Sequence, residues 1–396
     1  MAMVLLWVGL CWNAHAQQVW LMTYGTGDLI EERFGHNALW VRDPSNGIDH
    51  IYNFGFFDFD QPDFYKNYLF GRMQYFAVAR DPAEELSYYE WRDREVRAQQ
   101  LNLSNEQMAR LIDWLTLQVS PAQREFDYDY YFNNCSNRVR DALDFALNGW
   151  LKQTTSQIEA KQNFRQHTRR LIQSSPLLYL GIHTGLGRAT DRERSVWEAM
   201  FLPEVVAEQL VNLQVRTPDG TLEPLVLNDQ ILIESTRSAP PDHPETSWQL
   251  FAVLGLITAA LIIVPATLCS SSGWGLLAFR AWLLTSFLAG SGLLFLWLLT
   301  EHQAAWRNEN LLLLNPLMIA LWRARDGRWA KACAVLCGMS VILALALKFF
   351  NGAQWNYDLM LWWIPSQLAA LGVWWLRPFR QRSSGTDGQQ DLAQMG

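Results

Sequence analysis

Five apolar segments in the second half of the chain constrain its fold more than any other feature. They cover residues 248–268, 274–299, 311–322, 330–349 and 359–376. A helix rises about 1.5 Å per residue, so about 20 apolar residues cross a hydrocarbon core about 30 Å thick. Four of the segments are long enough for this. The third is short and contains Asn315-Pro316, so it is either a kinked span that starts near Arg307 or a re-entrant piece.

The basic residues predict how these segments are oriented. If the first half of the chain lies outside, the inside loops are 269–273 and 323–331, followed by the tail from Arg377. The second loop and the tail contain Arg323, Arg325, Arg328, Lys331, Arg377, Arg380 and Arg382. The outside loops contain one basic residue, Arg307. This excess of positive charge inside predicts an all-α domain of five transmembrane helices at 248–378 and a cytoplasmic tail at 379–396, provided that the third segment crosses.

The first half of the chain has the features of an exported domain. Its start, MAMVLLWVGLCWNAHA, contains an apolar core followed by Ala14-His15-Ala16, which predicts a signal peptide at 1–16; an uncleaved anchor is the alternative. Residues 1–247 carry a net charge of −11, against +4 for 248–396. Because phosphate binding needs a basic surface, the acidic first half argues against a nucleic-acid partner.

These features predict the domain order and the location of the protein. We expect an extracytoplasmic domain at 17–240 and a stiff, Pro-containing linker at 241–247, before the transmembrane domain. The protein would be a multi-pass protein of the cytoplasmic (inner) membrane. Its first domain would lie in the periplasm or outside the cell.

Two short β-rich segments near the start of the exported domain predict an antiparallel hairpin. They cover residues 34–41 and 50–55 and are joined by a turn with Pro, Asn and Gly at 43–47. His36 and His50 then lie on neighbouring strands. Asn53 is three residues beyond His50 and faces the opposite side of an ideal strand, so at most one of the two reaches His36.

Cys135 is the single cysteine of the expected exported domain. It cannot form an internal disulfide, so it is either a buried apolar filler or a reactive thiol. Val139, Leu143 and Ala146 follow at helical spacing, which predicts that Cys135 opens a helix. The unpaired N–H groups and partial positive charge of a helix N-terminus favour a thiolate and can hold an oxyanion. A base such as His36 would complete a nucleophile pair, although the sequence separation of the two residues says nothing about their contact.

The order of these features resembles a known family. A strand with a histidine, a second strand with a polar residue, and an Asn-Cys pair that opens a helix resemble the circularly permuted papain-like (NlpC-type) fold, which relatives of lecithin:retinol acyltransferase share. The chain is more similar still to the Lnb family of lipoprotein intramolecular transacylases, in which an extracytoplasmic domain precedes five transmembrane helices. The similar segments are Arg33-Phe34-Gly35-His36-Asn37-Ala38-Leu39, Tyr52-Asn53-Phe54-Gly55, Tyr68-Leu69-Phe70-Gly71-Arg72, Asn133-Asn134-Cys135-Ser136, Asp191 with Trp197-Glu198-Ala199-Met200-Phe201-Leu202-Pro203, Glu301-His302, Asn308-Glu309-Asn310 and Asn315-Pro316-Leu317. The resemblance therefore implies an α+β domain of permuted papain-like fold followed by an all-α domain of five helices.

The resemblance also implies acyl transfer. Enzymes of this family move the sn-2 acyl chain of a diacylglyceryl-modified lipoprotein onto the amine of its N-terminal cysteine. In this chain Cys135 would attack the ester and His36 would protonate the departing glycerol oxygen. His50 or Asn53 would orient His36, with His50 slightly favoured by analogy with the second polar residue of the permuted fold. The partner would be a membrane lipid or a lipoprotein, and we expect no metal or cofactor.

Seven further polar residues are candidates for substrate binding: Asn134, Arg72, Arg188, Asp191, His302, Arg307 and Asn310. The first two lie in segments that resemble the family. Arg188 and Asp191 belong to a charge cluster that is either a solvated helix start or a clamp for a head group or polypeptide. The last three lie in the polar loop 301–310, which is either a solvated turn or a cradle for a lipid head group.

Two other functions fit the same residues. One is a hydrolase of the same fold that cuts cell-wall peptides or ester lipids, and the other is a non-enzymatic membrane sensor whose exported domain binds a ligand. No residue discloses whether the acceptor is an amine or water. Because a lipid ester lies at the head-group level, the transferase predicts that Cys135 faces the membrane, with loop 302–310 beneath it.

Overall fold

The computed structural model describes residues 17–216, 220–245, 247–268, 273–322 and 327–376. The predicted signal peptide and cytoplasmic tail lie outside these residues. The chain packs into two compact units. The N-terminal unit comprises residues 1–245 and 296–307, and the helical unit comprises residues 246–295 and 308–396.

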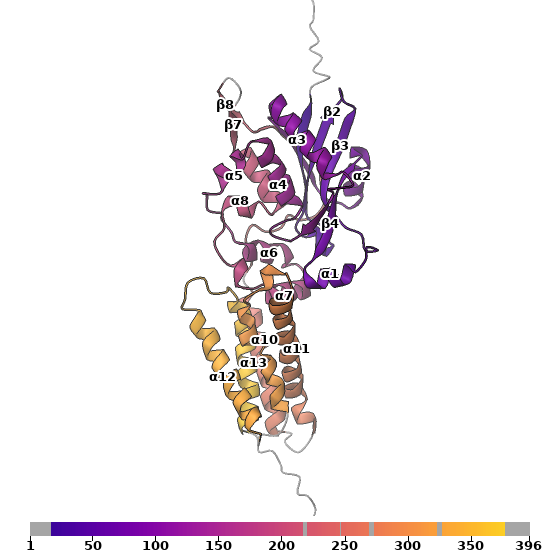
Figure 1. Cartoon of the computed structure of the whole chain (residues 1–396). Helices are drawn as coiled ribbons and strands as arrows, with labels where there is room; N and C mark the ends of the chain where they lie inside the picture. The colour runs from indigo at the N-terminus through magenta and orange to yellow at the C-terminus, as the bar shows by residue number, and fades with distance from the viewer. Residues whose placement is uncertain (1–16, 217–219, 246, 269–272, 323–326, 377–396) are drawn as a thin grey trace, which may run out of the picture. The chain divides into compact units, whose positions relative to one another are not determined.

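An antiparallel sheet forms the frame of the N-terminal unit (Figure 1). In the described part of the chain its seven strands follow the order β6-β4-β3-β2-β1-β5-β9. Their bounds are β1 Gln18–Tyr24, β2 His36–Asp43, β3 Ile48–Phe56, β4 Met73–Arg80, β5 Val96–Leu101, β6 Glu125–Tyr128 and β9 Val226–Ile233. A small separate sheet pairs β7 (Gln214–Arg216) with β8 (Leu222–Pro224).

Helices cover both faces of this sheet. They are α1 Phe64–Phe70, α2 Pro82–Trp91, α3 Asn105–Gln118, α4 Cys135–Ala146, α5 Trp150–Thr155, α6 Phe164–Ile172, α7 Pro176–Gly185, α8 Val196–Ala199 and α9 Pro203–Val211, with the 3-10 helices η1 Ile30–Glu32, η2 Arg188–Thr190 and η4 Gln303–Ala305. In Figure 1, α2 lies on one side of the sheet and α4 on the other. Because side chains alternate along a strand, Leu21 shares a core with Val139 of α4, whereas Met22 shares a core with Tyr89 of α2. The N-terminal unit is thus a mixed α/β domain.

The predicted hairpin is confirmed. β2 and β3 pair antiparallel, with Val41 opposite His50 and Ala38 opposite Asn53. Asp43 ends β2, and its carboxylate accepts hydrogen bonds from the side chains of Ser45 and Asn46, which fold the chain back into β3.

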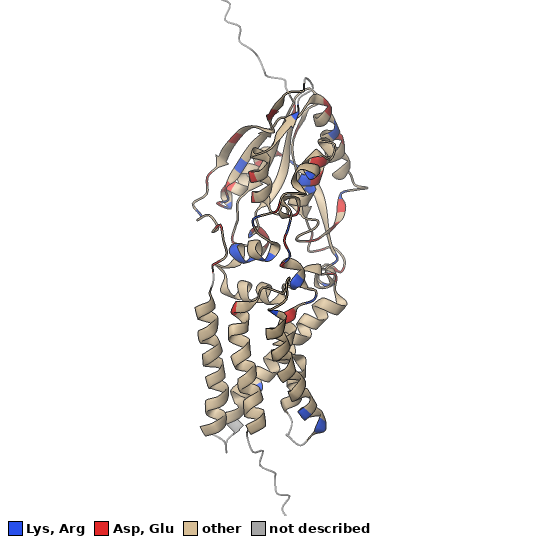
Figure 2. Ribbon diagram, turned by 90° about the vertical axis from the view of Figure 1, so that its left-hand side faces the viewer, with Lys and Arg blue, Asp and Glu red and all other residues tan. Residues whose placement is uncertain are grey.

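The helical unit contains four helices long and apolar enough to cross a membrane, counted among the described residues. They are α10 Trp248–Leu268, α11 Leu277–Leu299, α12 Arg328–Leu347 and α13 Tyr357–Leu376, and a short 3-10 helix, η3 Gly273–Leu276, precedes α11. Lys, Arg, Asp and Glu are sparse along the four helices (Figure 2). A charged side chain in the bilayer centre is costly, so this distribution is typical of membrane spans.

The third apolar segment is not a long helix. It forms two 3-10 helices, η5 (Glu309–Leu312) and η6 (Pro316–Trp322), which are separated at Asn315-Pro316. Proline lacks an N–H group and disfavours helical backbone in the residue before it, which explains the break. A fifth transmembrane helix of ordinary length is therefore not confirmed.

The same segment nevertheless extends along the helical unit. Its contacts, in chain order, are Glu309 Oε2 with Lys348 Nζ (2.6 Å), Leu312 O with Ser340 Oγ (2.7 Å), the Leu314 carbonyl with Gly290, and the Trp322 ring with Arg280 Cζ (5.5 Å). The segment thus passes first from Lys348, at the end of α12, to Ser340, and then from Gly290 to Arg280 on α11. The residue numbers of its partners decrease within each helix while its own increase. The segment therefore runs antiparallel to α11 and α12.

The end of α11 and the start of the polar loop pack with the N-terminal unit. The Glu301 N–H donates to the carbonyl of Phe70 at the end of α1 (2.8 Å). The Gly187 N–H donates to the carbonyl of Ala304 (2.7 Å). Residues 296–307 are thus held between α1 and the segment that precedes η2.

Candidate active site

Cys135 is the first residue of α4, as the sequence predicts. The Asn134 side chain accepts a hydrogen bond from the Asn137 N–H, and the Asn137 side chain accepts one from the Asn134 N–H, each 3.0 Å long. This reciprocal cap explains why the helix begins at this residue. The half-buried Cys135 Sγ lies 3.9 Å from Ser136 Oγ and sits where the helix dipole favours a negative charge.

His36 is the first residue of β2 and reaches the thiol. Gly35 before it adopts φ +75°, and a Cβ at that position would lie 2.8 Å from the Tyr24 carbonyl oxygen, so the turn into β2 needs glycine. Strand pairing places Tyr24 opposite His36, and their rings stack with centroids 5.7 Å apart. His36 shares a hydrogen bond with Cys135. The structure therefore brings together the two residues that the sequence singled out.

The pKa values of the two groups favour an ion pair. Burial raises the pKa of the Cys135 thiol, but the charge and hydrogen bond of His36 and the backbone N–H of Asn37 lower it, with a net change from 9.0 to about 7. Burial lowers the pKa of His36, but the Cys135 thiolate and hydrogen bonds to Cys135 and Asn53 raise it, and the net pKa is above its ordinary value. Near neutral pH a large share of the pair is therefore thiolate and imidazolium.

A buried relay behind His36 fixes its tautomer. The Asn53 amide donates through Nδ2 to both carboxylate oxygens of Glu85 (3.1 and 2.8 Å), so its Oδ1 must face His36 Nε2, which lies 2.9 Å away. In the neutral ring Nε2 is therefore the protonated nitrogen, which leaves Nδ1 as the nitrogen that can take up a proton from the thiol. Glu85 is 2% exposed and also accepts a hydrogen bond from the Tyr24 hydroxyl (2.6 Å).

We expect the alkylation rate of Cys135 by iodoacetamide to titrate with a midpoint near pH 7. The thiolate is the nucleophile, so the rate falls as the pH drops below the thiol pKa of about 7 and levels off above it. Intact-mass spectrometry of the full-length protein measures the rate. The Cys135→Ser variant gives the alkylation of the other cysteines, which is subtracted. A midpoint near the ordinary 9.0 would contradict the ion pair.

We expect Glu85→Gln to lower turnover by about tenfold, less than the roughly 10²–10⁴ that a general acid–base group contributes. A glutamine can donate as well as accept, so Asn53 would no longer be forced to present Oδ1 to His36. The loss of the negative charge of Glu85, which helps to raise the pKa of His36, would also move the midpoint of Cys135 alkylation upward. Glu84→Gln, on the exposed side of the same helix, is the matched control. An unchanged alkylation midpoint in Glu85→Gln would refute the positioning role.

The slight preference for His50 as the residue that orients His36 is wrong. His50 pairs with Val41, whereas His36 is opposite Tyr24, so the strand register separates the two histidines along the hairpin. The His50 side chain is exposed. Asn53 makes the hydrogen bond instead, in keeping with the expectation that at most one of the two reaches His36.

Three of the residues predicted to bind substrate are occupied by packing. Asn134 is the cap of α4, and its Nδ2 donates to the carbonyls of Tyr130 and Phe201. Asp191 is buried against Arg165, with an Nε–Oδ1 distance of 2.7 Å, which does not fit a clamp for a head group. Asn310 is 0% exposed and accepts a hydrogen bond from Asn356 within the helical unit.

The other predicted binding residues lie nearer the surface. Arg72 Nε donates to Glu301 Oε1 (2.7 Å), and His302 Nε2 lies 3.1 Å from the Tyr68 carbonyl. Arg188 and Arg307 are exposed. Neither Arg72 nor His302 is in contact with Cys135 in the described hydrogen bonds, so a role in substrate binding remains a prediction.

Two residues of the relay were missed by the sequence reasoning. Glu85 lies in the first turns of α2, whose start Asp81-Pro82 is a recognisable cap. Only the packing of α2 on the sheet, however, brings its carboxylate to Asn53. Tyr24 could have been found from the pairing of the first two strands, which places it opposite His36.

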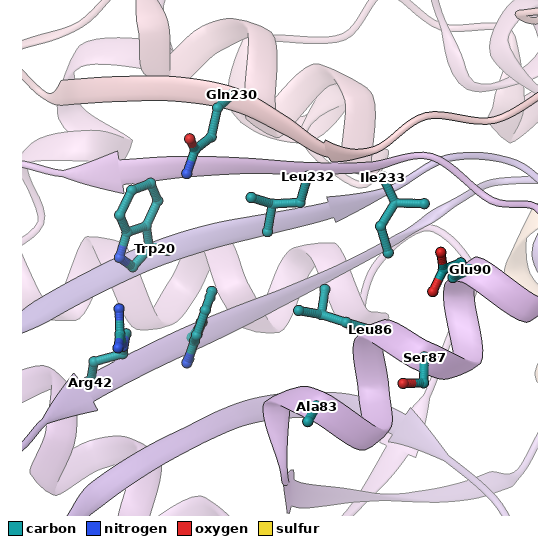
Figure 3. Close-up of a pocket in the computed structure, with 10 residues that line it drawn as sticks. Trp20, Arg42, Ala83, Leu86, Ser87, Glu90, Gln230, Leu232 and Ile233 are labelled. Carbon is teal, nitrogen blue, oxygen red and sulfur yellow. The ribbon is translucent and has the colours of Figure 1, made fainter.

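A separate cavity of about 560 Å³ lies on the α2 face of the sheet (Figure 3). Trp20 and Trp40 line it together with Leu86 of α2 and with Leu232 and Ile233 of β9. The residues described around it include no histidine or cysteine. Neither Cys135 nor His36 is among the residues that line this cavity, so it is not part of the Cys135 site.

Residues 12–174 match the family model of the Lnb N-terminal periplasmic domain. The matched part includes His36, Asn53, Glu85 and Cys135 and stops before the helical unit. No curated protein and no solved structure matches the chain.

Proposed function

We propose that this chain, whose residues 12–174 match the Lnb N-terminal periplasmic domain, is a thiol acyltransferase of the inner membrane. Its acyl donor would be a lipid ester, the diacylglyceryl group of a lipoprotein, and its acceptor the amine of the lipoprotein's N-terminal cysteine. The observation that carries the proposal is the hydrogen-bonded Cys135–His36 pair, with a thiol pKa of about 7, in a protein with membrane spans. A soluble enzyme would have no ready access to an ester whose chains lie in the bilayer.

The proposed reaction has two steps. The Cys135 thiolate attacks the ester carbonyl carbon, the bond to the glycerol oxygen breaks, and the His36 imidazolium gives its proton to that oxygen. The amine then attacks the resulting thioester, His36 takes up the amine proton, and the thiolate leaves. The products are an N-acyl group and a free glycerol hydroxyl. No atom is gained or lost between donor and acceptor.

The N-terminus of α4 would stabilise the charge that develops in both steps. An oxyanion formed beside Cys135 lies near the unpaired N–H groups of the first helical turn and near the Asn37 N–H that already faces the sulfur. Such preorganised donors typically contribute about 10²–10³ to the rate. The antiparallel strands with His36 and Asn53 packed beside this helix support the permuted papain-like arrangement that the sequence suggests.

We also propose that the chain crosses the membrane five times, with Glu309–Trp322 as the fifth crossing. The ring of Phe251 near the start of α10 contacts that of Trp362 near the start of α13, with centroids 6.3 Å apart and the planes tilted by 42°. This contact supports two helices that start at the same end and run in the same direction. This requires an odd number of crossings. A 3-10 helix rises about 2.0 Å per residue, so a short segment covers most of a core about 30 Å thick. Loop 323–331 and the tail, which hold most of the basic residues of this half, then share the inner side.

Mass spectrometry of lipoprotein N-terminal peptides tests the proposed function. In cells that express the wild-type chain we expect one acyl chain to move from glycerol to the N-terminal amine, and we expect no such product with Cys135→Ala. Release of free fatty acid without N-acylation would indicate the hydrolase. Unchanged function of Cys135→Ala would indicate the sensor and overturn the proposal.

A further inference from the structure

An exposed aromatic surface surrounds α1 in the N-terminal unit. Its members are Phe59 (60% exposed), Tyr65 (74%), Tyr68 (44%), Leu69 (51%) and Tyr130 (39%), which we call the aromatic patch. Phe64 beneath the patch contacts three of them, with ring centroids 5.1 Å from Phe59, 5.3 Å from Tyr65 and 6.3 Å from Tyr68. The hydroxyls of Tyr68 and Tyr130 lie 3.2 Å apart. The patch is thus one continuous surface, and such apolar surfaces usually mark a contact with a partner or a membrane.

The patch is close to the thiol. The Tyr130 carbonyl accepts a hydrogen bond from Asn134, the residue before Cys135 (2.8 Å). The Tyr130 ring contacts that of Tyr128, with centroids 5.6 Å apart. A Cβ at Gly55 would lie 3.8 Å from the Tyr128 ring and 3.9 Å from Cys135 Cβ. One aromatic side chain therefore separates the patch from the neighbourhood of the sulfur.

The residues that follow α11 are bound to the end of α1, beside the patch. Besides the bond between Glu301 and Phe70, the Arg72 guanidinium pairs with Glu301 at 2.7 Å, and Gly71 lies against His302 so closely that a Cβ would be 2.9 Å from the His302 nitrogen. Glu301 is two residues beyond the end of α11 at Leu299. Successive Cα atoms are about 3.8 Å apart, so the C-terminal end of α1 is held roughly 10 Å from the end of α11. The polar layer of a bilayer extends about 5–8 Å beyond the hydrocarbon core on each side.

We propose that the aromatic patch is a membrane-docking surface that enters the head-group layer of the bilayer containing the chain's own helices. Tyrosine and phenylalanine suit this layer because an apolar ring meets the acyl chains while the tyrosine hydroxyl stays with water and head groups. Bound there, the patch presents a lipid ester to Cys135; this last step rests on the proposed acyl transfer. The docking itself does not depend on it.

Photo-crosslinking tests the docking independently of catalysis. The full-length protein is reconstituted in nanodiscs of phosphatidylethanolamine and phosphatidylglycerol, with p-benzoylphenylalanine in place of Tyr65. The control carries it in place of Trp91, which is 75% exposed on α2, outside the patch. After irradiation we expect a phospholipid adduct on the peptide with position 65 and only background on the peptide with position 91. The absence of an adduct at 65, or equal adducts at both positions, would overturn the docking.

Acylation of Cys135 tests the presentation of the ester. Intact-mass spectrometry compares two donors, a diacylglyceryl lipopeptide in the nanodisc and water-soluble p-nitrophenyl butyrate. In the double variant Tyr65→Ser, Leu69→Ser, we expect the ratio of bilayer-donor to soluble-donor rates to fall by about tenfold or more, because two apolar contacts with the membrane are lost. Trp91→Ser keeps the ratio. An unchanged ratio in the double variant overturns the presentation but leaves acyl transfer standing, whereas a wild-type chain that neither donor acylates refutes the proposed function.

Discussion

Replacement of Cys135 by serine is expected to lower N-acyl product formation by about 10³-fold or more, the scale seen when a nucleophile is removed from a catalytic pair. A hydroxyl is far less ionised than a thiol whose pKa is about 7, so the nucleophile disappears although its position is kept. The side chain changes little in volume, and the cap of α4 is formed by Asn134 and Asn137, so the fold is expected to persist.

The measurement is the mass of the lipoprotein N-terminal peptide after incubation with purified variant in nanodiscs. Cys333→Ser, on α12 of the helical unit, is the matched control and keeps full activity. Equal circular dichroism and melting temperature of both variants show that the fold is intact. Full activity of Cys135→Ser would end the thiol mechanism.

Replacement of His36 by asparagine is expected to lower turnover by roughly 10²–10⁴, the range for a general acid–base group. The variant loses the group that protonates the glycerol oxygen and takes up the amine proton. It also removes the charge and hydrogen bond that lower the thiol pKa, while burial, which raises that pKa, remains. The midpoint of Cys135 alkylation is therefore expected to move from about 7 to at least the ordinary 9.0.

His50→Asn is the matched control for this variant. His50 is exposed on the same hairpin and pairs with Val41, away from the thiol. We expect this variant to keep both the turnover and the alkylation midpoint of the wild type. A shift of the alkylation midpoint in His50→Asn, or an unchanged midpoint in His36→Asn, would show that His36 is not the base.

Local patterns predicted several parts of this structure because the forces behind them act over a few residues. The turn at Asp43 fixes the β2–β3 hairpin through hydrogen bonds of its own carboxylate, and helical spacing after Cys135 identifies the start of α4. Long apolar runs predicted the four helices that, among the described residues, are long and apolar enough to cross a membrane.

Strand register decided which residue orients His36, and no local pattern encodes it. His50 and Asn53 are three residues apart, and the pairing of β2 with β3 brings only Asn53 to the ring. No local pattern encodes the position of Glu85 either. It lies on α2 and reaches Asn53 because this helix packs on the sheet. The sequence also suggested Asp191 as part of a clamp for a head group, whereas in the structure its buried carboxylate pairs with Arg165.

By itself, the sequence determined an exported domain with a solitary thiol at a helix start, a hairpin with a candidate base, and an apolar second half, because each depends on residue type and short-range spacing. Only the tertiary structure decided that His36 meets Cys135, that Asn53 and Glu85 hold His36, and that Glu301 is hydrogen-bonded to the end of α1. These contacts join residues far apart in the chain. Their geometry is set by the packing of helices on a sheet, to which every core side chain contributes and which no single segment contains.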